Sequence, residues 1–579
     1  MTEIHAPGGP LPYIPDDVTV VQFMLDYTHE SRPTAPAAQL NPCMIEDATG
    51  RRVTFAEVKA RTTALANALS SRLGIKEDDV VCICSPNHVD YPVTVWATHR
   101  LGAVVTAANP AYTVGELEHQ LTTTCTKLLI VHPWNYATAS AAASNANIPH
   151  DHIILLDEVG EAVYPQQTVQ RLVEDGLSCP PSFVERSLRP GEADKKLAFL
   201  SLSSGTTGRP KAVCIPHRAV VAGIIQLAHL ANQQRMRWEE RKLRAGDIWL
   251  AQMPFFHIYG LVVIMHFALF YSVTIVVVPK FHLTDMLASI QRHRINLLPV
   301  VPPMVVLLCK NPAISQFDLS SLRVVVCGAA PLSAELVRQL SSILPTVHIG
   351  QGYGMTEAVG SLAFLQMEQK IGTPGSAGRL LPGIIARVVR PDGSLAKLGQ
   401  PGHLIVKGPC MALGYLNDEQ ATEETFVDGW LYTGDEVMVN EQAEVFILDR
   451  IKELLKVRGY QVAPAELEGH LLVHPDVADV CVVGVPDDYN GEVPLAFVVP
   501  QADALNRMKN DPAEADRVKA ALVKHVADAK VQYKWLTGGV HFIDAIPKNP
   551  SGKLLRRTLR DRAKELQEQG PSVSIRAKL

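Results

Sequence analysis

The chain has 579 residues, of which 47% are hydrophobic and 20% are charged, and its formal net charge at pH 7 is −5. This length exceeds one hydrophobic core, because cores stop growing at about 250–300 residues, so two or more domains are expected. The composition is that of a soluble globular protein, and the small net charge gives no argument for nucleic acid or an anionic membrane as partner.

The ten cysteines are spread along the chain without a repeated short spacing. They indicate neither a disulfide framework nor a metal site, and Cys82 and Cys84 alternate as two residues on one face of a strand do. The first 17 residues contain early proline and glycine but no apolar segment typical of a signal peptide. We therefore expect a reducing, intracellular compartment.

Short β-rich runs alternate with helical patterns from about residue 53 onward. The clearest runs cover residues 80–84, 128–131, 153–156, 274–278 and 323–327. Such alternation predicts α/β layers with largely parallel sheets. A patch rich in alanine and serine at residues 137–146 predicts a surface helix.

The segment at residues 203–211 reads SSGTTGRPK and follows the end of a predicted strand. Two glycines free its backbone to wrap an anion, and four hydroxyls with successive N–H groups can bind phosphate oxygens. Lys211 adds a positive charge at the end of the segment. The spacing differs from that of a Walker A loop, and a flexible loop without a ligand is the alternative.

Residues 260–278 form a nearly apolar run that is long enough to cross a membrane. The run changes character midway, since residues 261–270 are typical of a buried helix while residues 274–278 are β-branched and end at Pro279. We expect a buried helix followed by a buried strand, not a transmembrane segment.

Two further segments carry carboxylates after glycine-rich turns. Residues 350–357 read GQGYGMTE, in which the glycines let the backbone approach a flat ligand and Glu357 is placed to hold Mg²⁺. Residues 432–435 read YTGD, in which Asp435 can bind both hydroxyls of a ribose. Either segment alone is also compatible with a plain turn.

A domain boundary is predicted near residues 449–452. We divide the chain into an N-terminal domain, residues 1–449, and a C-terminal domain, residues 450–579, of about the usual domain size. The second domain has the pattern strand, helix, strand, strand, helix and ends in a basic tail at residues 553–562. Lys553 follows a Ser-Gly turn, a position at which lysine is usually just exposed.

In combination these segments resemble the adenylate-forming superfamily of acyl-CoA synthetases, adenylation domains and luciferases, most of all the 4-coumarate–CoA ligase-like branch. The resemblance extends from about residue 19 to residue 557. It is carried by PFFHIY at residues 254–259, GAAPL at 328–332, GWLYTGD at 429–435 and RIKELLKVRGYQVAP at 450–464. It implies an α/β protein with a large, multi-subdomain N-terminal domain of mostly parallel sheets and a small, mobile α+β C-terminal domain.

The resemblance also implies an AMP-forming acid–CoA ligase that uses ATP, Mg²⁺ and coenzyme A. Residues implied to bind ATP or AMP are Ser203, Ser204, Thr206, Thr207, Lys211, Gly328, Ala329, Gln351, Gly352, Tyr353, Thr356, Asp435, Arg450 and Lys553. Residues implied to meet coenzyme A are Arg458, Gly459 and Tyr460. Residues implied to form the acid pocket are His257, Ile258, Tyr259, Val262, Val326, Gly328, Gly352, Gly360 and Ser361.

The resemblance assigns catalytic roles to Lys553, Thr356, Glu357, His257, Lys456 and Gln461. Lys553 would bridge the acid carboxylate and the α-phosphate, Glu357 would hold Mg²⁺, and Lys452 would be the hinge of the swinging C-terminal domain. A carboxylate that attacks an ATP phosphorus brings two anions together, so positive charge aimed at the transition state is the expected source of catalysis.

The acid pocket departs from that of true 4-coumarate ligases at two positions. Val262 replaces an asparagine, and Val326 replaces a lysine. An apolar pocket does not select a ring hydroxyl, so we expect a medium-chain aliphatic acid or an unsubstituted aryl-alkanoic acid.

The chain ends in Ala577, Lys578 and Leu579, which resembles the Ser-Lys-Leu peroxisomal address. It predicts the peroxisomal import receptor as partner, with a cytoplasmic protein bearing an ordinary tail as the alternative. Four functional alternatives stay open: an acyl-AMP ligase that loads a carrier protein, a true 4-coumarate–CoA ligase, a luciferase-like oxidase, and a non-catalytic nucleotide-binding protein.

Overall fold

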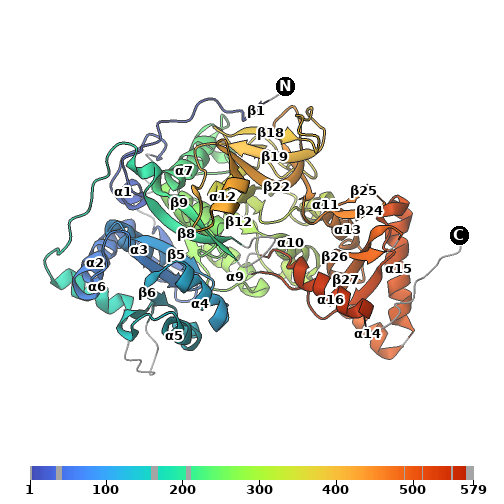
Figure 1. Cartoon of the computed structure of the whole chain (residues 1–579), viewed down its shortest axis with the longest axis horizontal. Helices are drawn as coiled ribbons and strands as arrows, with labels where there is room; N and C mark the ends of the chain where they lie inside the picture. The colour runs from blue at the N-terminus through green and yellow to red at the C-terminus, as the bar shows by residue number, and fades with distance from the viewer. Residues whose placement is uncertain are drawn as a thin grey trace.

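The computed structural model describes residues 3–33, 42–157, 167–203, 210–458, 460–487, 489–511, 513–549 and 552–568. Two large sheets, two antiparallel sheets and a separate C-terminal lobe make up the fold (Figure 1). The C-terminal lobe lies to the right in that view, and the helices and strands of residues 55–155 lie at the left.

The first large sheet has seven strands in the order β20-β9-β8-β5-β4-β6-β7. Its strands are β4 (Val80–Cys84), β5 (Val104–Ala108), β6 (Thr126–Val131), β7 (Ile153–Leu155), β8 (Leu197–Ser203), β9 (Lys211–Pro216) and β20 (Gly414–Tyr415). The first five are parallel, whereas β9 and β20 are antiparallel additions at one edge. The accompanying helices are α2 (Phe55–Leu73), α3 (Tyr91–Arg100), α4 (Val114–Thr123), α5 (Tyr136–Asn145), α6 (Val169–Ser178) and α7 (His217–Asn232).

The second large sheet also has seven strands, in the order β14-β13-β12-β10-β11-β2-β3. Its strands are β2 (Met44–Glu46), β3 (Arg52–Val53), β10 (Ile248–Ala251), β11 (Thr274–Val277), β12 (Leu297–Val300), β13 (Val324–Cys327) and β14 (His348–Gln351). All neighbours are parallel except β2 and β3. Its helices are α9 (Leu283–His293), α10 (Pro302–Lys310) and α11 (Ala334–Ile343).

Two antiparallel sheets complete the N-terminal part. The larger contains β1 (Ile4–His5), β18 (Ile385–Val389), β19 (Gly402–Lys407), β21 (Phe426–Val427), β22 (Trp430–Val439) and β23 (Val445–Arg450), beside α12 (Glu419–Thr425). The smaller contains β15 (Tyr353–Met355), β16 (Gly360–Phe364) and β17 (Arg379–Leu380). Mostly parallel large sheets were the fold predicted from the sequence, and the structure confirms them.

The C-terminal lobe has its own five-stranded sheet. Its elements are β24 (Leu455–Val457), β25 (Tyr460–Val462), α13 (Pro464–Leu471), β26 (Val477–Asp487), β27 (Gly491–Pro500), α14 (Ala502–Asn510), α15 (Glu514–Ala529), β28 (Gly539–Phe542) and α16 (Arg556–Glu568). The pattern of strand, helix, two strands and helix was therefore incomplete. It missed the strands β25 and β28, since three or four residues show too little alternation, and it gave one helix where α14, α15 and α16 follow β27.

The hydrophobic cores divide along the same line. One cluster of buried residues runs from Val20 to Val445, whereas two others begin at Leu455 and Cys481. The first core ends at Val445 and the next begins at Leu455. This interval contains residue 450 but does not single it out, so the domain boundary at residue 450 stays a prediction.

The long apolar run folds as a helix and a strand. A π-helix (η6, Tyr259–Phe267) continues into α8 (Ala268–Phe270), and β11 follows in the middle of the second sheet. Among the described residues, no helix combines the length and the apolar character that crossing a membrane requires.

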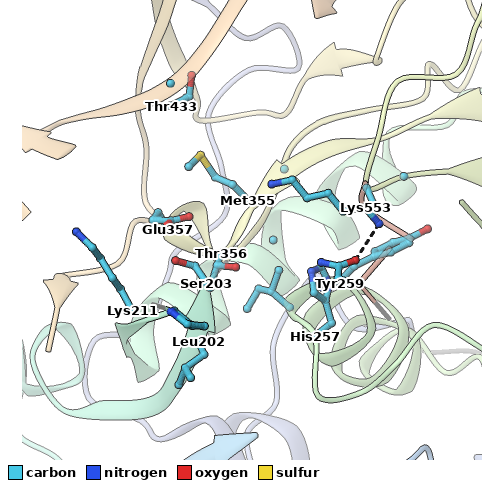
Figure 2. A pocket seen from close by; sticks show the side chains of 18 of the residues that line it. Leu202, Ser203, Lys211, His257, Tyr259, Met355, Thr356, Glu357, Thr433 and Lys553 are labelled. Carbon is cyan, nitrogen blue, oxygen red and sulfur yellow. Dashed lines mark hydrogen bonds between the residues drawn. The ribbon is translucent and has the colours of Figure 1, made fainter. Parts of the chain in front are cut away.

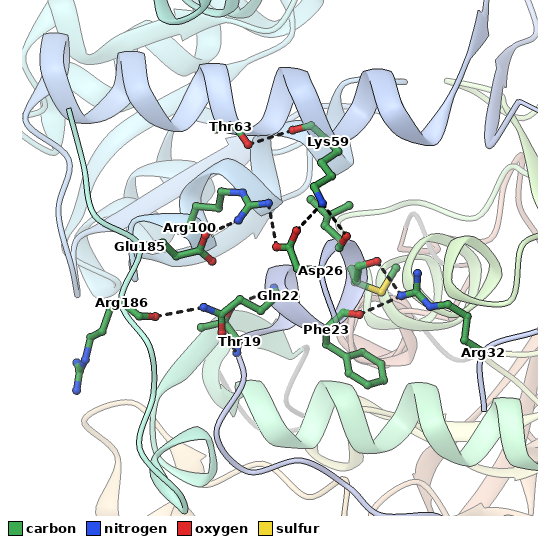
Figure 3. A network of polar contacts seen from close by, with 12 residues as sticks. Thr19, Gln22, Phe23, Asp26, Arg32, Lys59, Thr63, Arg100, Glu185 and Arg186 are labelled. Atoms are coloured by element: carbon green, nitrogen blue, oxygen red, sulfur yellow. Dashed lines mark hydrogen bonds and ion pairs between the residues drawn. The ribbon is translucent and has the colours of Figure 1, made fainter. Parts of the chain in front are cut away.

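A polar network fastens the N-terminal segment to this scaffold (Figure 3). Thr19 caps the buried helix α1 (Val20–Leu25), and Asp26 just after it lies 2.8 Å from Lys59 Nζ and 3.1 Å from Arg100 of α3. The Arg32 guanidinium donates to two carbonyls of α1, at 2.7 and 3.0 Å. The network therefore holds α1 where it contacts both α3 and α7.

Three buried histidines lie where α1, α3, α7 and η6 meet. His217 Nδ1 accepts from the backbone N–H of Val20 at 3.0 Å, and His266 Nε2 accepts from Trp96 Nε1 at 3.1 Å. A ring nitrogen that accepts cannot carry a proton, so both imidazoles are neutral. Burial lowers the pKa of His99 to about 3 and that of His266 to about 4.

We predict that acid destabilises this protein through the histidine cluster. The folded-state pKa of His99 lies below its unfolded value of about 6.5, so the unfolded chain binds more protons and stability falls as pH drops below about 6.5. From pH 7 to pH 5 the expected loss is about 2 kcal/mol per histidine. Urea unfolding of wild type and His99→Gln at both pH values measures it. An equal pH dependence in both proteins would contradict the assignment to His99.

Candidate active site

A cavity of about 840 Å³ opens beside the carboxyl ends of β5, β8 and β13. This is the edge at which open α/β sheets bind ligands, and the volume is in the range of small-molecule sites. The structure brings together there most of the residues that the sequence singled out: Ser203, Lys211, His257, Ile258, Tyr259, Val326, Gly328, Ala329, Gly352, Tyr353, Thr356, Glu357, Gly360, Ser361, Arg450, Lys452 and Lys553.

Seven predicted positions lie outside the described residues, namely Ser204, Thr206, Thr207, Gly459, Ala577, Lys578 and Leu579. The ends of the first of these segments are nevertheless fixed. Ser203 ends β8, Lys211 begins β9, and the two residues pair across an antiparallel ladder. Ser203 and Lys211, which flank the predicted phosphate-binding residues, both line the cavity.

Glu357 lies in a 3₁₀ turn, η8 (Thr356–Ala358), that follows β15 directly. The turn is tight: a Cβ atom at Gly354 would lie 1.5 Å from the carbonyl oxygen of Gly360, so only glycine fits there. The Glu357 side chain is buried, and its Oε1 accepts from the hydroxyl of Tyr415 at 2.9 Å. Figure 2 shows Glu357 on the same side of the cavity as Lys211.

Asp435 and Arg450 face each other across neighbouring strands. They are Cα partners in the β22–β23 ladder, and Arg450 Nε lies 2.8 Å from Asp435 Oδ1. Asp435 Oδ2 accepts from the hydroxyl of Tyr353 at 2.5 Å. The backbone N–H of Gly434 donates to His403 Nε2 at 2.9 Å, which fixes the turn before Asp435. Arg450 and Tyr353 line the cavity, while the Asp435 carboxylate supports them from behind.

Lys553 comes from the C-terminal lobe and reaches into the cavity. Figure 2 shows its side chain extending toward Met355, above His257 and Tyr259. Its backbone N–H donates to Asn549 Oδ1 at 2.8 Å, which shapes the loop that carries it. Burial and the positive charge of Arg450 lower the pKa of Lys553, an environment that favours an anion between the two cations.

His257 begins the apolar end of the cavity. Burial lowers its pKa to about 4, with a second contribution from the positive charge of Lys553. The imidazole is therefore neutral near pH 7, and its Nδ1 accepts from the backbone N–H of Tyr259 at 3.3 Å. Together with Val263, Val326 and Phe364, His257 belongs to the same cavity wall.

Besides Asp435, two predicted site residues of the N-terminal part, Val262 and Gln351, are not among those that line the cavity. Val262 was expected in the acid pocket, but it lies behind Gly360, where a Cβ atom would sit 3.7 Å from Val262 Cβ. Val263, the next residue of the π-helix, lines the cavity instead. Gln351 is buried and uses its amide to bind the backbone of Leu332 and Ser376.

Several predicted residues of the C-terminal lobe lie away from the cavity. Lys456 and Gln461 are exposed Cα partners in the β24–β25 hairpin. Arg458 lies over the ring of Tyr489 at 5.2 Å, and Tyr460 is 56% exposed. In this arrangement the lobe presents Lys553, and not the hairpin, to the cavity. Lys452, by contrast, lines the cavity from the exposed turn between β23 and β24, and its role as the hinge stays a prediction.

Sequence reasoning missed two residues that shape the site. Asn87 follows β4, donates to the carbonyls of Ala251 and Met253 at 2.9 and 3.0 Å, and accepts from the N–H of Phe255 at 2.7 Å. It thereby fastens the segment leading to His257 onto the first sheet. The second residue that sequence reasoning missed is Tyr415, whose hydroxyl donates to Glu357. No local pattern marks either residue, since both act through contacts far along the chain.

The arrangement is suited to a large anion that carries an apolar group. Lys211, Arg450 and Lys553 supply positive charge from three separate elements, and Glu357 can hold a cation that neutralises phosphates. The wall from His257 to Phe364 is mostly apolar. Among the described residues no group of three or more His, Cys, Asp and Glu could hold a metal ion.

Two family models match the chain. The model described as AMP-binding enzyme matches residues 28–416, and the model of the AMP-binding enzyme C-terminal domain matches residues 466–553. Among curated proteins, 4-coumarate–CoA ligase 2 of Oryza sativa subsp. japonica is 39% identical over 541 residues, covering 91% of this chain and 90% of the relative. 4-Coumarate–CoA ligase 1 of Arabidopsis thaliana is 34% identical and covers 95% and 93% of the two chains.

Solved structures give the same picture of the fold. The anthranilate CoA ligase AuaEII in complex with anthranoyl-AMP is 22% identical, with a TM-score of 0.81 over 96% of this chain and 99% of the other. ATP-bound MatB from Rhodopseudomonas palustris is 25% identical, with a TM-score of 0.77 over 95% and 99%.

Proposed function

This chain belongs to the AMP-binding enzyme family, and we propose that it activates a weakly polar carboxylic acid with ATP and transfers the acyl group to coenzyme A. The class of AMP-forming acid–CoA ligase rests on the family match and on relatives named as CoA ligases. The observation that carries the proposal is one cavity that unites Lys553 of the C-terminal lobe with Lys211, Glu357 and Arg450 of the N-terminal part.

The proposed chemistry has two steps. A carboxylate oxygen bonds to the α-phosphorus of ATP, the bond to the β,γ-phosphates breaks, and pyrophosphate leaves. The coenzyme A sulfur then bonds to the acyl carbon, AMP leaves, and the thiol proton passes to solvent. Lys553 and Arg450 stabilise charge at the α-phosphate and Lys211 faces the leaving phosphates, which is electrostatic catalysis by preorganised cations.

Glu357 fits a magnesium site that is completed by ATP. A single buried carboxylate with phosphate oxygens is the donor set that Mg²⁺ prefers, and the Tyr415 hydroxyl bond leaves the second carboxylate oxygen to a ligand. Bound there, Mg²⁺ would neutralise phosphate charge. The residues of this chain orient that carboxylate and keep it in one position.

The proposed acid is medium-chain aliphatic or aryl-alkanoic without ring hydroxyls. Val263, Val326 and Phe364 make the cavity wall apolar, and a buried hydroxyl without a partner costs about 1–3 kcal/mol. A true 4-coumarate–CoA ligase is the second candidate. It is favoured by the relatives and by the hydroxyls of Tyr259 and Ser361, which also line the cavity.

Coenzyme A is the proposed acceptor, with a carrier-protein thiol as the alternative. Arg458 and Tyr460 are exposed on the C-terminal lobe, and they resemble the segment that meets coenzyme A. For them to reach the cavity, the lobe would have to take a second orientation. A luciferase-like oxidation and a non-catalytic role find no specific support in the residues of the cavity.

We predict that Lys553→Ala separates the two half-reactions. Adenylate formation, followed as pyrophosphate release over a panel of carboxylic acids, should fall by several hundredfold. Thioester formation from synthetic acyl-adenylate and coenzyme A should persist. Lys548→Ala is the matched control, because Lys548 also lines the cavity but lies 2.6 Å from Asp479. Equal loss of both half-reactions would rule out the role given to Lys553.

We predict that unsubstituted cinnamate, phenylalkanoates or medium-chain fatty acids exceed p-coumarate in kcat/KM, by about tenfold for the loss of one buried hydroxyl bond. Val326→Thr places a hydroxyl in the cavity at nearly constant volume and should move the ratio toward p-coumarate. Val262→Thr, behind Gly360, should not. Steady-state rates at saturating ATP and coenzyme A decide, and a p-coumarate preference in wild type would favour the second candidate.

The last three residues lead us to propose import into peroxisomes. A fluorescent protein fused to the N-terminus should then colocalise with a peroxisomal marker. Deletion of Ala577, Lys578 and Leu579 should leave the fusion in the cytoplasm. Replacement of Ala577 by serine, which restores the common signal, should preserve import. A wild-type fusion that stays cytoplasmic would refute the proposal.

A further inference from the structure

One short segment joins the two charged side chains at the phosphate end of the cavity. Strand β20 pairs antiparallel with β9, the strand that begins at Lys211, with Tyr415 opposite Val213. Just before β20, the N–H of Ala412 donates to the carbonyl of Glu357 at 2.9 Å. The backbone of residues 412–416 therefore holds the strand of Lys211 and the turn of Glu357 in a fixed relation.

Side chains of the same segment contact both charges. The Tyr415 hydroxyl donates to Glu357, and the Tyr415 ring lies 5.2 Å from Lys211 Nζ. Asp418, three residues on, places its Oδ2 at 3.0 Å from the same ammonium group. Lys211 is thus held by a carboxylate and an aromatic face, both from a segment about 200 residues away in sequence.

In the Asp418–Lys211 ion pair, a stronger anion can readily replace the Asp418 carboxylate. The two side chains are 36% and 34% exposed, and an ion pair that solvent reaches contributes little to stability. A phosphate group carries more charge than a carboxylate and can take over the ammonium group. Asp418 and a phosphate group would then share or compete for the Lys211 ammonium group.

We propose that Asp418 competes with the nucleotide phosphates for Lys211 and so weakens the hold of the site on pyrophosphate. The inference rests on the proposed function, in which Lys211 faces the leaving phosphates. This competition favours release of pyrophosphate, because the Lys211 ammonium group that loses pyrophosphate can pair again with the neighbouring Asp418. Asp418 is accordingly a positioning residue that acts through Lys211.

Asp418 has a second role that can be separated from the first. Its Oδ1 accepts from the N–H of Ala421 at 3.0 Å and caps the N-terminus of α12. A cap needs one acceptor oxygen and no charge, and asparagine and serine cap as well as aspartate. Asp418→Asn therefore keeps the cap and removes the ion pair.

The test is equilibrium binding of inorganic pyrophosphate, followed by isothermal titration calorimetry at fixed Mg²⁺ concentration and low ionic strength. We expect Asp418→Asn to bind pyrophosphate about two- to fivefold more tightly than wild type, the range of an exposed ion pair. Asp418→Ser, which also caps, should do the same and covers the case that one variant misfolds. Unchanged or weaker binding in both variants overturns the proposal.

A double-mutant cycle shows whether Lys211 transmits the effect. In a Lys211→Met background, Asp418→Asn should leave the pyrophosphate affinity unchanged, since no shared cation remains. An equal gain in that background would mean simple repulsion between a carboxylate and phosphate, and it overturns the proposal. Glu419→Gln, which removes the neighbouring exposed charge on α12, is the matched control and should give less than the gain of Asp418→Asn.

The outcome is distinguishable from failure of the proposed function. Pyrophosphate binding needs neither acid nor coenzyme A, so the affinities can shift as expected even if no acid supports pyrophosphate release by wild type. In active enzyme, Asp418→Asn should lower the KM for ATP while product inhibition by pyrophosphate becomes stronger. A rise in the KM for ATP would show that Asp418 aids phosphate binding, contrary to the proposal.

Discussion

The rest of the site depends on the ion pair between Asp435 and Arg450. It joins the last residue of β23 to β22, and the Tyr353 hydroxyl binds the same carboxylate from the smaller antiparallel sheet. The Asp435 carboxylate is buried whereas Arg450 is 30% exposed, so loss of Arg450 would leave a buried charge without its partner. Beyond Arg450 the chain leaves the first hydrophobic core and enters the second, and the lobe built on that second core contributes Lys553 to the cavity wall.

The charged side chains of the cavity lie at one end and at its centre, and the other end is neutral and apolar. At one end Lys211 and Glu357 share Tyr415 as a common support, while at the centre Arg450 and Lys553 approach each other closely enough to lower the pKa of Lys553. Two cations that repel each other bind an anion between them more strongly than either alone, so the site is preorganised for charge that develops during reaction. At the other end His257 is neutral, and the wall beyond it is apolar.

The C-terminal lobe carries two sets of functional candidates that cannot face the cavity together. Lys553 lies in the cavity wall, whereas Lys456 and Gln461 project from the β24–β25 hairpin into solvent. Both sets belong to one small unit with its own core, so a change of face requires the unit to move as a whole. Lys452 lies in the exposed turn between β23 and β24, and its role as the hinge of such a movement stays a prediction.

The sequence by itself determined the parallel α/β layers, because β-branched runs are a local signal. Its motifs also determined the family, and the resemblance to that family implied most of the residues that line the cavity. Lys211 and Glu357 could be named from glycine-rich local segments, whereas Arg450 was named from the resemblance. Only the tertiary structure decided that Val263 and not Val262 lines the cavity, since both residues lie in one apolar run whose sequence does not mark the side that faces a ligand. It alone placed Asn87, Tyr415 and Asp418, which act on partners between 58 and 207 residues away, because long-range packing selects such contacts.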